Sequence, residues 1–323
     1  MTIEFVGWTI LLISGVVVLI KGADLLVEGG SKTAAYFGVP VIIIGLTLVS
    51  FGTSVPELAS SLNAVLKGRT GISIGNVIGS NVANILLVLG VSSMVKPISV
   101  DIGVVKREIP IMFGAMALLM IFSVSLSIGR LEGVILLLGL ICYIAFFIWV
   151  AFIEGEEEVV EDKFESLPDK KLQKQGLNIN LIKLCLGLAG IAVGAEMMIR
   201  SSIFYIEEFQ LSEGLVGLTI IALATSLPEL ATSSVAAYKG ESDISIGNVI
   251  GSNTFNILMV LGVSALFVPI TFTIEIIPNI IIMISVSVLF TIFVYTGRRL
   301  GRIEGAIMTS AYILYLIYLY LGR

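Results

Sequence analysis

The sequence predicts an all-α polytopic membrane protein, with ten transmembrane helices arranged as two inverted five-helix repeats. The prediction rests on the composition, on long apolar runs and on an internal duplication. Of the 323 residues, 57% are hydrophobic and only 13% are charged, and the mean hydropathy is +1.05. Soluble domains carry about 25% charged residues. The chain therefore has too few charges to coat a water-exposed surface, which excludes a soluble globular protein.

Residue usage excludes several other kinds of function. The net charge of −5 offers no basic surface for nucleic acid, and the absence of histidine removes the commonest metal ligand. Cys142 and Cys185 lie in apolar runs without a CxxC spacing, so neither a disulfide framework nor a zinc site is indicated. The start MTIEFVGW lacks a basic segment and a small-residue cleavage site, and we expect no cleaved signal peptide.

Long continuous apolar runs indicate membrane-spanning helices, since a transmembrane β-barrel would show short alternating segments. A helix needs about 20 mostly apolar residues to cross the hydrocarbon core. The ten expected spans are 5–30, 40–66, 73–95, 107–127, 131–153, 179–207, 213–238, 245–267, 275–296 and 303–321.

Basic residues predict the orientation of these spans. If the spans alternate in direction, thirteen Lys and Arg residues fall on the side opposite the N-terminus and five fall on the N-terminal side. Because loops rich in Lys and Arg stay in the cytoplasm, we expect both termini outside the cell membrane. The stretch 154–178 is then an acidic cytoplasmic linker, which lacks the spaced ligands and the glycine of an EF-hand loop.

The two halves of the chain are related by duplication. Residues 45–98 and 217–270 align without gaps at an offset of 172, and 33 of the 54 aligned positions are identical. We therefore expect one repeat over 1–153 and a second over 179–323. Five spans are an odd number, so the second repeat enters the membrane from the opposite side. Inverted repeats with broken helices near the midplane are typical of secondary transporters.

Each repeat places a carboxylate at mid-membrane depth. Glu57 and Glu229 occupy matching positions, and no basic residue lies in the spans that carry them. A charged side chain at this depth costs at least about 2.5–3.5 kcal/mol on insertion scales. We interpret the two glutamates as ion ligands rather than as members of structural ion pairs.

A proline precedes each glutamate and predicts a broken helix. Pro56 and Pro228 have no N–H to donate to the carbonyl groups one turn earlier, so each helix should break there and turn backbone oxygens toward a cavity. The hydroxyl groups that lie within one turn of the carboxylates belong to Thr53, Ser54, Thr225 and Ser226.

A second motif, GNVIGSN-x-x-N, supplies the opposite wall of this cavity. Its polar residues fall four apart, on one helical face. They are Asn76, Ser80 and Asn84 in one half and Asn248, Ser252 and Asn256 in the other. Asn81 and Asn253 lie off this face, and we expect them to form interhelical hydrogen bonds.

The resulting site contains only oxygen ligands, which hard cations such as Ca²⁺ prefer, whereas transition metals would recruit His or Cys. Two carboxylates balance one Ca²⁺ or two Na⁺. One site can therefore take the competing ions in turn, which is the condition for exchange. No GxxxxGK[ST] motif is present to bind ATP.

The paired motifs resemble those of the Ca²⁺:cation antiporter superfamily, in its prokaryotic Na⁺/Ca²⁺ exchanger branch. The resemblance rests on GTSVPE with GNVIGSNVAN and on ATSLPE with GNVIGSNTFN, and it covers nearly the whole chain. It implies exchange of cytoplasmic Ca²⁺ for external Na⁺ by alternating access, in which the first and sixth spans slide against the rest. It implies a transporter in the lipid bilayer, without enzyme activity and without a cofactor.

The resemblance also implies a role for each site residue. Glu57 and Glu229 would be shared by Ca²⁺ and Na⁺, and the central Ca²⁺ site would include Thr53, Thr225, Asn84 and Asn256. One flanking Na⁺ site would use Ser54, Ser80 and the backbone of Ser50. The other would use Ser226, Ser252 and the backbone of Ala222.

Several alternatives remain open. Asn256 stands where many relatives, including the K⁺-dependent branch, carry Asp, so we expect K⁺-independent exchange. A third Na⁺ would make the cycle electrogenic, a number that only the resemblance suggests. An H⁺/Ca²⁺ antiporter is the nearest alternative, although the GN-x-x-E motif of those proteins is absent. A cation channel is more remote because it needs a continuous pore. Asp24 and Glu196 fit either an entry path or an interface, and nothing indicates an oligomeric state.

Overall fold

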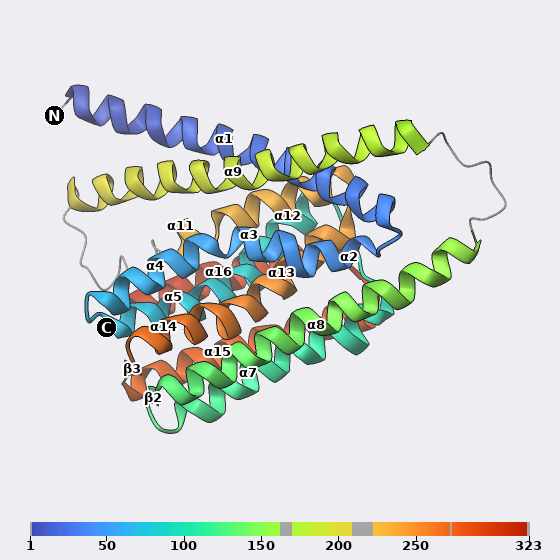
Figure 1. Cartoon of the computed structure of the whole chain (residues 1–323). Helices are drawn as coiled ribbons and strands as arrows, with labels where there is room; N and C mark the ends of the chain where they lie inside the picture. The colour runs from blue at the N-terminus through green and yellow to red at the C-terminus, as the bar shows by residue number, and fades with distance from the viewer. Residues whose placement is uncertain (1, 162–169, 209–221, 272, 322–323) are drawn as a thin grey trace.

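The computed structural model describes residues 2–161, 170–208, 222–271 and 273–321, which form an almost entirely helical bundle (Figure 1). The α-helices are α1 (Thr2–Phe37), α2 (Val41–Ile44), α3 (Ser50–Thr53), α4 (Val55–Leu66), α5 (Thr70–Ala83), α6 (Leu89–Val95), α7 (Ile109–Ser123), α8 (Arg130–Glu161), α9 (Lys170–Glu208), α11 (Ala222–Thr225), α12 (Leu227–Lys239), α13 (Ser242–Phe255), α14 (Gly262–Phe267), α15 (Ile277–Gly297) and α16 (Arg302–Leu321). Between them lie π-helical turns η1 (Gly45–Val49), η2 (Asn84–Val88), η3 (Val104–Glu108) and η6 (Asn256–Leu261), and the 3-10 turn η7 (Ile274–Ile276).

Membrane-crossing helices dominate the described part of the chain. Seven of them are long and apolar enough to cross a membrane, and the bent pair Val41–Thr53 and Val55–Leu66 would make eight. The fourth expected span, 107–127, contains α7, which continues η3 without a break, and this helix carries Lys106, Arg107 and Glu108 near its start. The seventh expected span, 213–238, begins outside the described residues. The structure is thus polytopic and helical, and the number of ten spans stays a prediction.

Several helices continue past the expected ends of their spans. α1 runs to Phe37 instead of ending near residue 30, α8 runs to Glu161, and α9 begins at Lys170. Most of the expected linker 154–178 is therefore helical, and residues 162–169 lie outside the described part. Glu, Lys and Gln are good helix formers, so a helix can continue after its sequence becomes polar. Hydropathy locates the apolar segment and not the end of the helix.

α1 and α9 lie side by side as a long pair over one face of the other helices (Figure 1). Glycines line their contact. A Cβ atom at Gly22 would lie 2.6 Å from the backbone nitrogen of Ile191, and one at Gly29 would lie 2.7 Å from that of Leu184. Small residues let the backbones of membrane helices approach closely. The pair depends on glycine at these positions.

Replacing Gly22 by Ala is expected to lower the stability of the protein, because the added methyl group has to push α9 away. Overpacking of this kind costs about 1–3 kcal/mol. The measurement is the thermal unfolding midpoint in detergent. Gly7→Ala is the matched control in the same helix, since no neighbouring atom of the described residues lies within 4 Å of a Cβ added there. Equal midpoints for the two variants would contradict the close contact.

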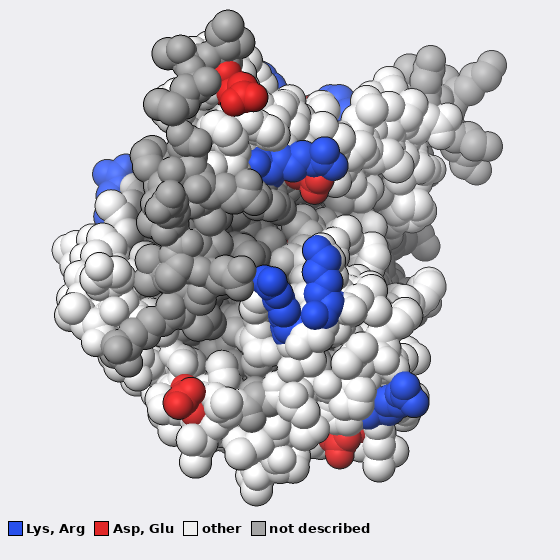
Figure 2. Space-filling model, turned by 90° about the vertical axis from the view of Figure 1, so that its left-hand side faces the viewer, with Lys and Arg blue, Asp and Glu red and all other residues white. Residues whose placement is uncertain are grey.

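Two short antiparallel strand pairs each join a segment from one half of the chain to a segment from the other. β1 (Ile98–Ser99) pairs with β4 (Arg299–Leu300), and β2 (Ser127–Ile128) pairs with β3 (Ile270–Thr271). These strands differ from the sequence prediction, which contained helices alone. The strands lie in connections between helices, where the backbone N–H and C=O groups need partners outside a helix. Among the described residues at the end of the bundle where α1 begins, with β2 and β3, the charged side chains are scattered and do not form one continuous patch (Figure 2).

α5 and α13 form the buried centre of the bundle. All residues of 73–83 and of 244–255 are buried, which includes both GNVIGSN motifs. The broken helices α3–α4 and α11–α12 pack against them. The elements of the two halves coincide at the offset of 172 found in the sequence, as Ser50–Thr53 and Ala222–Thr225 illustrate. This arrangement brings the polar motifs of both halves to the centre.

Candidate cation-binding site

Each of the two TS-x-PE segments contains a break in its helix. Ser54 separates α3 from α4 with φ −84° and ψ 1°, and Ser226 separates α11 from α12 with φ −84° and ψ 2°. The first break bends the chain by 41°. The predicted breaks are therefore present, although they lie two residues before the prolines. Pro56 and Pro228 occupy the first turn of the next helix, where the backbone N–H has no partner to lose.

Glu57 and Glu229 follow these breaks and are fully buried. Their carboxyl groups are close enough to repel each other when both are ionised. Within the described part of the chain, neither carboxyl oxygen of either residue has a hydrogen-bond partner. Each glutamate lies in the first turn of a helix, whose positive end favours a carboxylate. A cation between the two groups would relieve their repulsion.

Hydroxyl groups of one half meet the motif of the other half. Thr53 Oγ1 donates to Asn248 Oδ1 at 3.0 Å and lies 3.2 Å from Ser252 Oγ. The equivalent contacts join Thr225 Oγ1 to Asn76 Oδ1 at 3.3 Å and to Ser80 Oγ at 3.5 Å. The hydroxyls of Thr53, Ser54 and Ser252 face Glu229, and that of Thr225 faces Glu57. The broken helix of each half thus packs on the GNVIGSN helix of the other.

Asn76 and Asn248 hold this arrangement together, although they were not among the ligands expected from the sequence. Asn76 Nδ2 donates to Ser61 Oγ at 3.0 Å and to the Glu57 carbonyl at 3.4 Å. The equivalent bonds of Asn248 reach Ser233 Oγ at 2.9 Å and the Glu229 carbonyl at 3.5 Å. Each amide therefore fixes the backbone of one glutamate and the threonine of the other half. Their place on the Asn–Ser–Asn face was the signal for this role.

Asn84 and Asn256 stand where α5 and α13 pass into the π-helical turns η2 and η6. Both amide atoms of Asn84, and Oδ1 of Asn256, lack a hydrogen-bond partner among the described residues. Asn256 Nδ2 donates to Asn81 Oδ1 at 3.0 Å, and Asn81 Nδ2 donates to the Asn253 carbonyl at 3.2 Å. These bonds join α5 to the other half, which confirms the interhelical role predicted for Asn81.

The two backbone carbonyl groups expected to bind Na⁺ already accept hydrogen bonds. The Ser50 carbonyl accepts from the Ser54 N–H at 3.0 Å and from the Thr53 hydroxyl at 3.3 Å. The Ala222 carbonyl accepts equivalent bonds from Ser226 and Thr225, at 3.1 and 3.2 Å. Ser50 and Ala222 therefore lie beside the other expected ligands, and their role in binding an ion stays a prediction.

The unpartnered side-chain oxygens at this centre form a set that suits a hard cation. They belong to Glu57, Glu229, Ser54, Ser226, Asn84 and Asn256, all of them buried. An unsatisfied buried polar group costs about 1–3 kcal/mol, and folded proteins satisfy nearly all such groups. Carboxylate, hydroxyl and amide oxygens are ligands of Ca²⁺. No three His, Cys, Asp or Glu side chains gather within the described ranges, so neutral oxygens have to complete the site.

Asp24 and Glu196 form ion pairs away from this centre. Asp24 Oδ1 lies 2.7 Å from Lys239 Nζ, and Glu196 Oε1 lies 2.6 Å from Arg200 Nε. All four side chains are partly or largely exposed. The first pair links α1 to α12, and the second lies within α9.

Comparison with known proteins gives consistent matches over the full length. The sodium/calcium exchanger protein family matches residues 7–149 and 179–321. The inner membrane protein YrbG of Escherichia coli is 35% identical over 323 residues, covering 97% of this chain and 96% of that protein. The sodium/calcium exchanger MaX1 of Methanosarcina acetivorans is 34% identical over 342 residues, covering 96% and 98%. A solved structure of the sodium–calcium exchanger NCX_Mj superposes with a TM-score of 0.82 at 30% identity, covering 98% and 99%.

Proposed function

The chain belongs to the sodium/calcium exchanger protein family, and from this premise we propose that it exchanges Ca²⁺ for Na⁺ across the membrane by alternating access. One observation carries the proposal: two buried carboxyl groups that would repel each other when ionised lie among unpartnered neutral oxygens, without a basic side chain paired to them in the described part of the chain. This set can neutralise one Ca²⁺ or two Na⁺. Because Ca²⁺ and Na⁺ need the same carboxylates, binding of one kind of ion displaces the other.

The proposed ligands divide into a shared centre and two flanks. Glu57 and Glu229 bind either ion, and Thr53, Thr225, Asn84 and Asn256 complete the Ca²⁺ site. The flanking Na⁺ ligands are Ser54, Ser80 and the Ser50 carbonyl on one side, and Ser226, Ser252 and the Ala222 carbonyl on the other. The burial of these residues and the matched contacts of Thr53 and Thr225 support this assignment.

The proposed architecture consists of two inverted repeats of five spans, 1–153 and 179–323, with both termini outside the cell membrane and residues 154–178 in the cytoplasm. The coincidence of helix ends at an offset of 172 supports a repeat. Inversion supplies a physical basis for alternating access, because two related halves can exchange their conformations around a fixed site. The α1–α9 pair is the proposed sliding unit, since the close glycine contacts between its two helices hold them together as one body.

Na⁺ is the proposed coupling ion in preference to H⁺. The Ser54 and Ser226 hydroxyls are unpartnered in the described structure. They are neutral ligands that a Na⁺ ion uses, whereas a proton needs only the carboxylates. Asn256 adds no third carboxylate, which favours K⁺-independent exchange. A third Na⁺ on two carboxylates would leave one net charge moved in each cycle, so we propose that exchange is electrogenic.

Uptake of radioactive Ca²⁺ into proteoliposomes tests this function. Vesicles loaded with Na⁺ and diluted into Na⁺-free buffer should accumulate Ca²⁺, and vesicles loaded with K⁺ should not. A valinomycin-set potential should change the rate of uptake if the cycle moves net charge. Uptake driven by acid loading would assign the protein to the H⁺-coupled alternative. Uptake without any opposing gradient would indicate a channel.

A further inference from the structure

The helix that leads to the first half of the site contains a π-helical turn. η1 covers Gly45–Val49 and passes directly into α3, which carries Ser50 and Thr53. In an α-helix the Ser50 N–H would donate to the carbonyl of Leu46, four residues earlier. Here it donates to the carbonyls of Gly45 and Thr47 instead. The π-helical turn therefore leaves the Leu46 carbonyl without the N–H donor that it would have in an α-helix.

Tyr143 of α8 donates to this carbonyl. Its hydroxyl lies 2.9 Å from the Leu46 carbonyl oxygen, and its side chain is only 4% exposed. The ring packs edge-on against Phe147 and Phe255, with centroid distances of 4.9 and 5.8 Å. These contacts hold the ring, and the hydroxyl therefore points at one backbone atom of η1. No property of an apolar helix requires a tyrosine here, since phenylalanine would make the same ring contacts.

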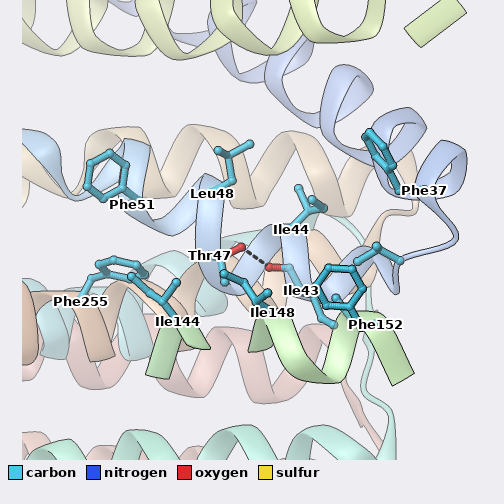
Figure 3. Close-up of a pocket in the computed structure, with 12 residues that line it drawn as sticks. Phe37, Ile43, Ile44, Thr47, Leu48, Phe51, Ile144, Ile148, Phe152 and Phe255 are labelled. Carbon is cyan, nitrogen blue, oxygen red and sulfur yellow. Dashed lines mark hydrogen bonds between the residues drawn. The ribbon is translucent and has the colours of Figure 1, made fainter. Parts of the chain in front are cut away.

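Apart from the Tyr143 hydroxyl, the Leu46 carbonyl oxygen lies against Gly251 of α13, where an added Cβ atom would be only 2.6 Å away. α8 and η1 border an apolar groove of about 780 Å³, lined by residues that include Ile144, Ile148 and Phe51 (Figure 3). Thr47 is the one polar residue among those that line it, and its hydroxyl donates to the Ile43 carbonyl at 2.6 Å (Figure 3). A buried carbonyl without a donor costs about 1–3 kcal/mol. The Tyr143 hydroxyl thus stabilises the π-turn specifically.

The π-turn matters for the site because both of its flanks touch α13. Before the turn, a Cβ atom at Gly247 would lie 2.9 Å from the Ile42 carbonyl oxygen. After it, Ser50 Oγ lies 3.0 Å from the Asn248 carbonyl oxygen of α13, and its shortest hydrogen bond, at 2.6 Å, goes to the Gly45 carbonyl within η1. The π-turn accommodates one extra residue between these contacts. If the turn became α-helical, the residues after it would rotate by about 100° relative to those before it, since 3.6 residues make one turn.

We propose that Tyr143 is a positioning residue for the cation site, whose hydroxyl holds the π-turn that aims Ser50 and Thr53 at α13. The inference rests on the proposed function, because it concerns the same site. Tyr143 touches no ion itself. It acts from α8, through the backbone of η1, on the side chains that meet the GNVIGSN helix of the other half.

The test compares equilibrium binding of radioactive Ca²⁺ to purified wild type, Tyr143→Phe and the control Tyr312→Phe. Tyr312 is a second buried tyrosine, with 4% exposure, and its hydroxyl makes no hydrogen bond within the described structure. Tyr143→Phe should raise the Ca²⁺ dissociation constant about fivefold, as expected for the loss of one hydrogen bond of about 1 kcal/mol. Tyr312→Phe should leave it unchanged.

A deletion of Thr47 separates positioning from general stability. Without the extra residue, the Phe51 N–H falls four residues after Leu46 and can take over as donor. Tyr143→Phe should therefore weaken Ca²⁺ binding in the wild-type background and have no effect in the deletion background. An equal effect in both backgrounds would overturn the proposal. The proposal would also be overturned if the Tyr143→Phe protein binds Ca²⁺ like wild type, whether or not its unfolding midpoint falls. Failure of this variant to fold would overturn the proposal too.

Calcium binding and transport by the wild type distinguish an error in the proposed function from an error in the role of Tyr143. If wild type neither binds nor transports Ca²⁺, the proposed function is wrong. If wild type does both and Tyr143→Phe binds equally well, only the role of Tyr143 is wrong.

Discussion

Replacing either Glu57 or Glu229 by Gln is expected to abolish exchange. The amide keeps the size of the side chain and removes one of the two negative charges that repel each other at the centre. One remaining carboxylate cannot balance a buried Ca²⁺. Removing one of two oppositely charged buried partners, here a carboxylate beside the bound Ca²⁺, costs about 3–5 kcal/mol. Uptake of radioactive Ca²⁺ by Na⁺-loaded proteoliposomes should fall at least about a hundredfold, since 1.4 kcal/mol corresponds to a factor of ten.

Glu275→Gln is the matched control for these variants. Glu275 is an exposed carboxylate that accepts a hydrogen bond from the Thr273 hydroxyl, outside the central site. Its replacement should leave uptake unchanged. Normal Ca²⁺ flux in either Glu57→Gln or Glu229→Gln would show that the two carboxylates do not carry the ion, and the proposed site would then be wrong.

Replacing Gly251 by Ala is expected to disable the site without replacing any of the proposed ligands. A Cβ atom at this position of α13 would collide with Ser50 Oγ and would lie 2.6 Å from the Leu46 carbonyl oxygen. The η1–α3 segment has to move away, which breaks the contact between Thr53 and Asn248. With an overpacking cost of about 1–3 kcal/mol, exchange should fall about tenfold or more, as measured by uptake into proteoliposomes.

Gly114→Ala provides the comparison for this variant. Gly114 lies within α7, and in the described part of the chain no neighbouring atom comes within 4 Å of a Cβ added there. This variant should transport like wild type. If Gly251→Ala is folded by gel filtration and also transports like wild type, the close approach of α3 to α13 does not position the site.

The central polar residues could be predicted from the sequence because they are expensive in an apolar span. Glu57 and Glu229 stand out for this reason, and Pro56 and Pro228 predicted the helix breaks beside them. The structure buries both glutamates and places the breaks within two residues of the prolines. The break precedes the proline because the first turn of a helix is where proline is tolerated.

Other features had no signal in a single sequence. Periodicity shows which residues share a helical face, but it does not show which helix that face meets. The hydrogen bond from Thr53 to Asn248 therefore could not be predicted from the sequence. The same holds for η1 and Tyr143, since a π-turn inserts one residue without a change in composition. The paired strands were missed because two-residue strands leave no alternation to detect.

Competition between Na⁺ and Ca²⁺ for binding to the purified protein is the most direct test of a shared site. Na⁺ should displace radioactive Ca²⁺ completely, with a Hill coefficient above one, because at least two Na⁺ are needed to replace the charge of one Ca²⁺. Added K⁺ at the same ionic strength should leave Ca²⁺ bound. If saturating Na⁺ leaves Ca²⁺ binding unchanged, the two ions do not share Glu57 and Glu229, and exchange through one site is contradicted.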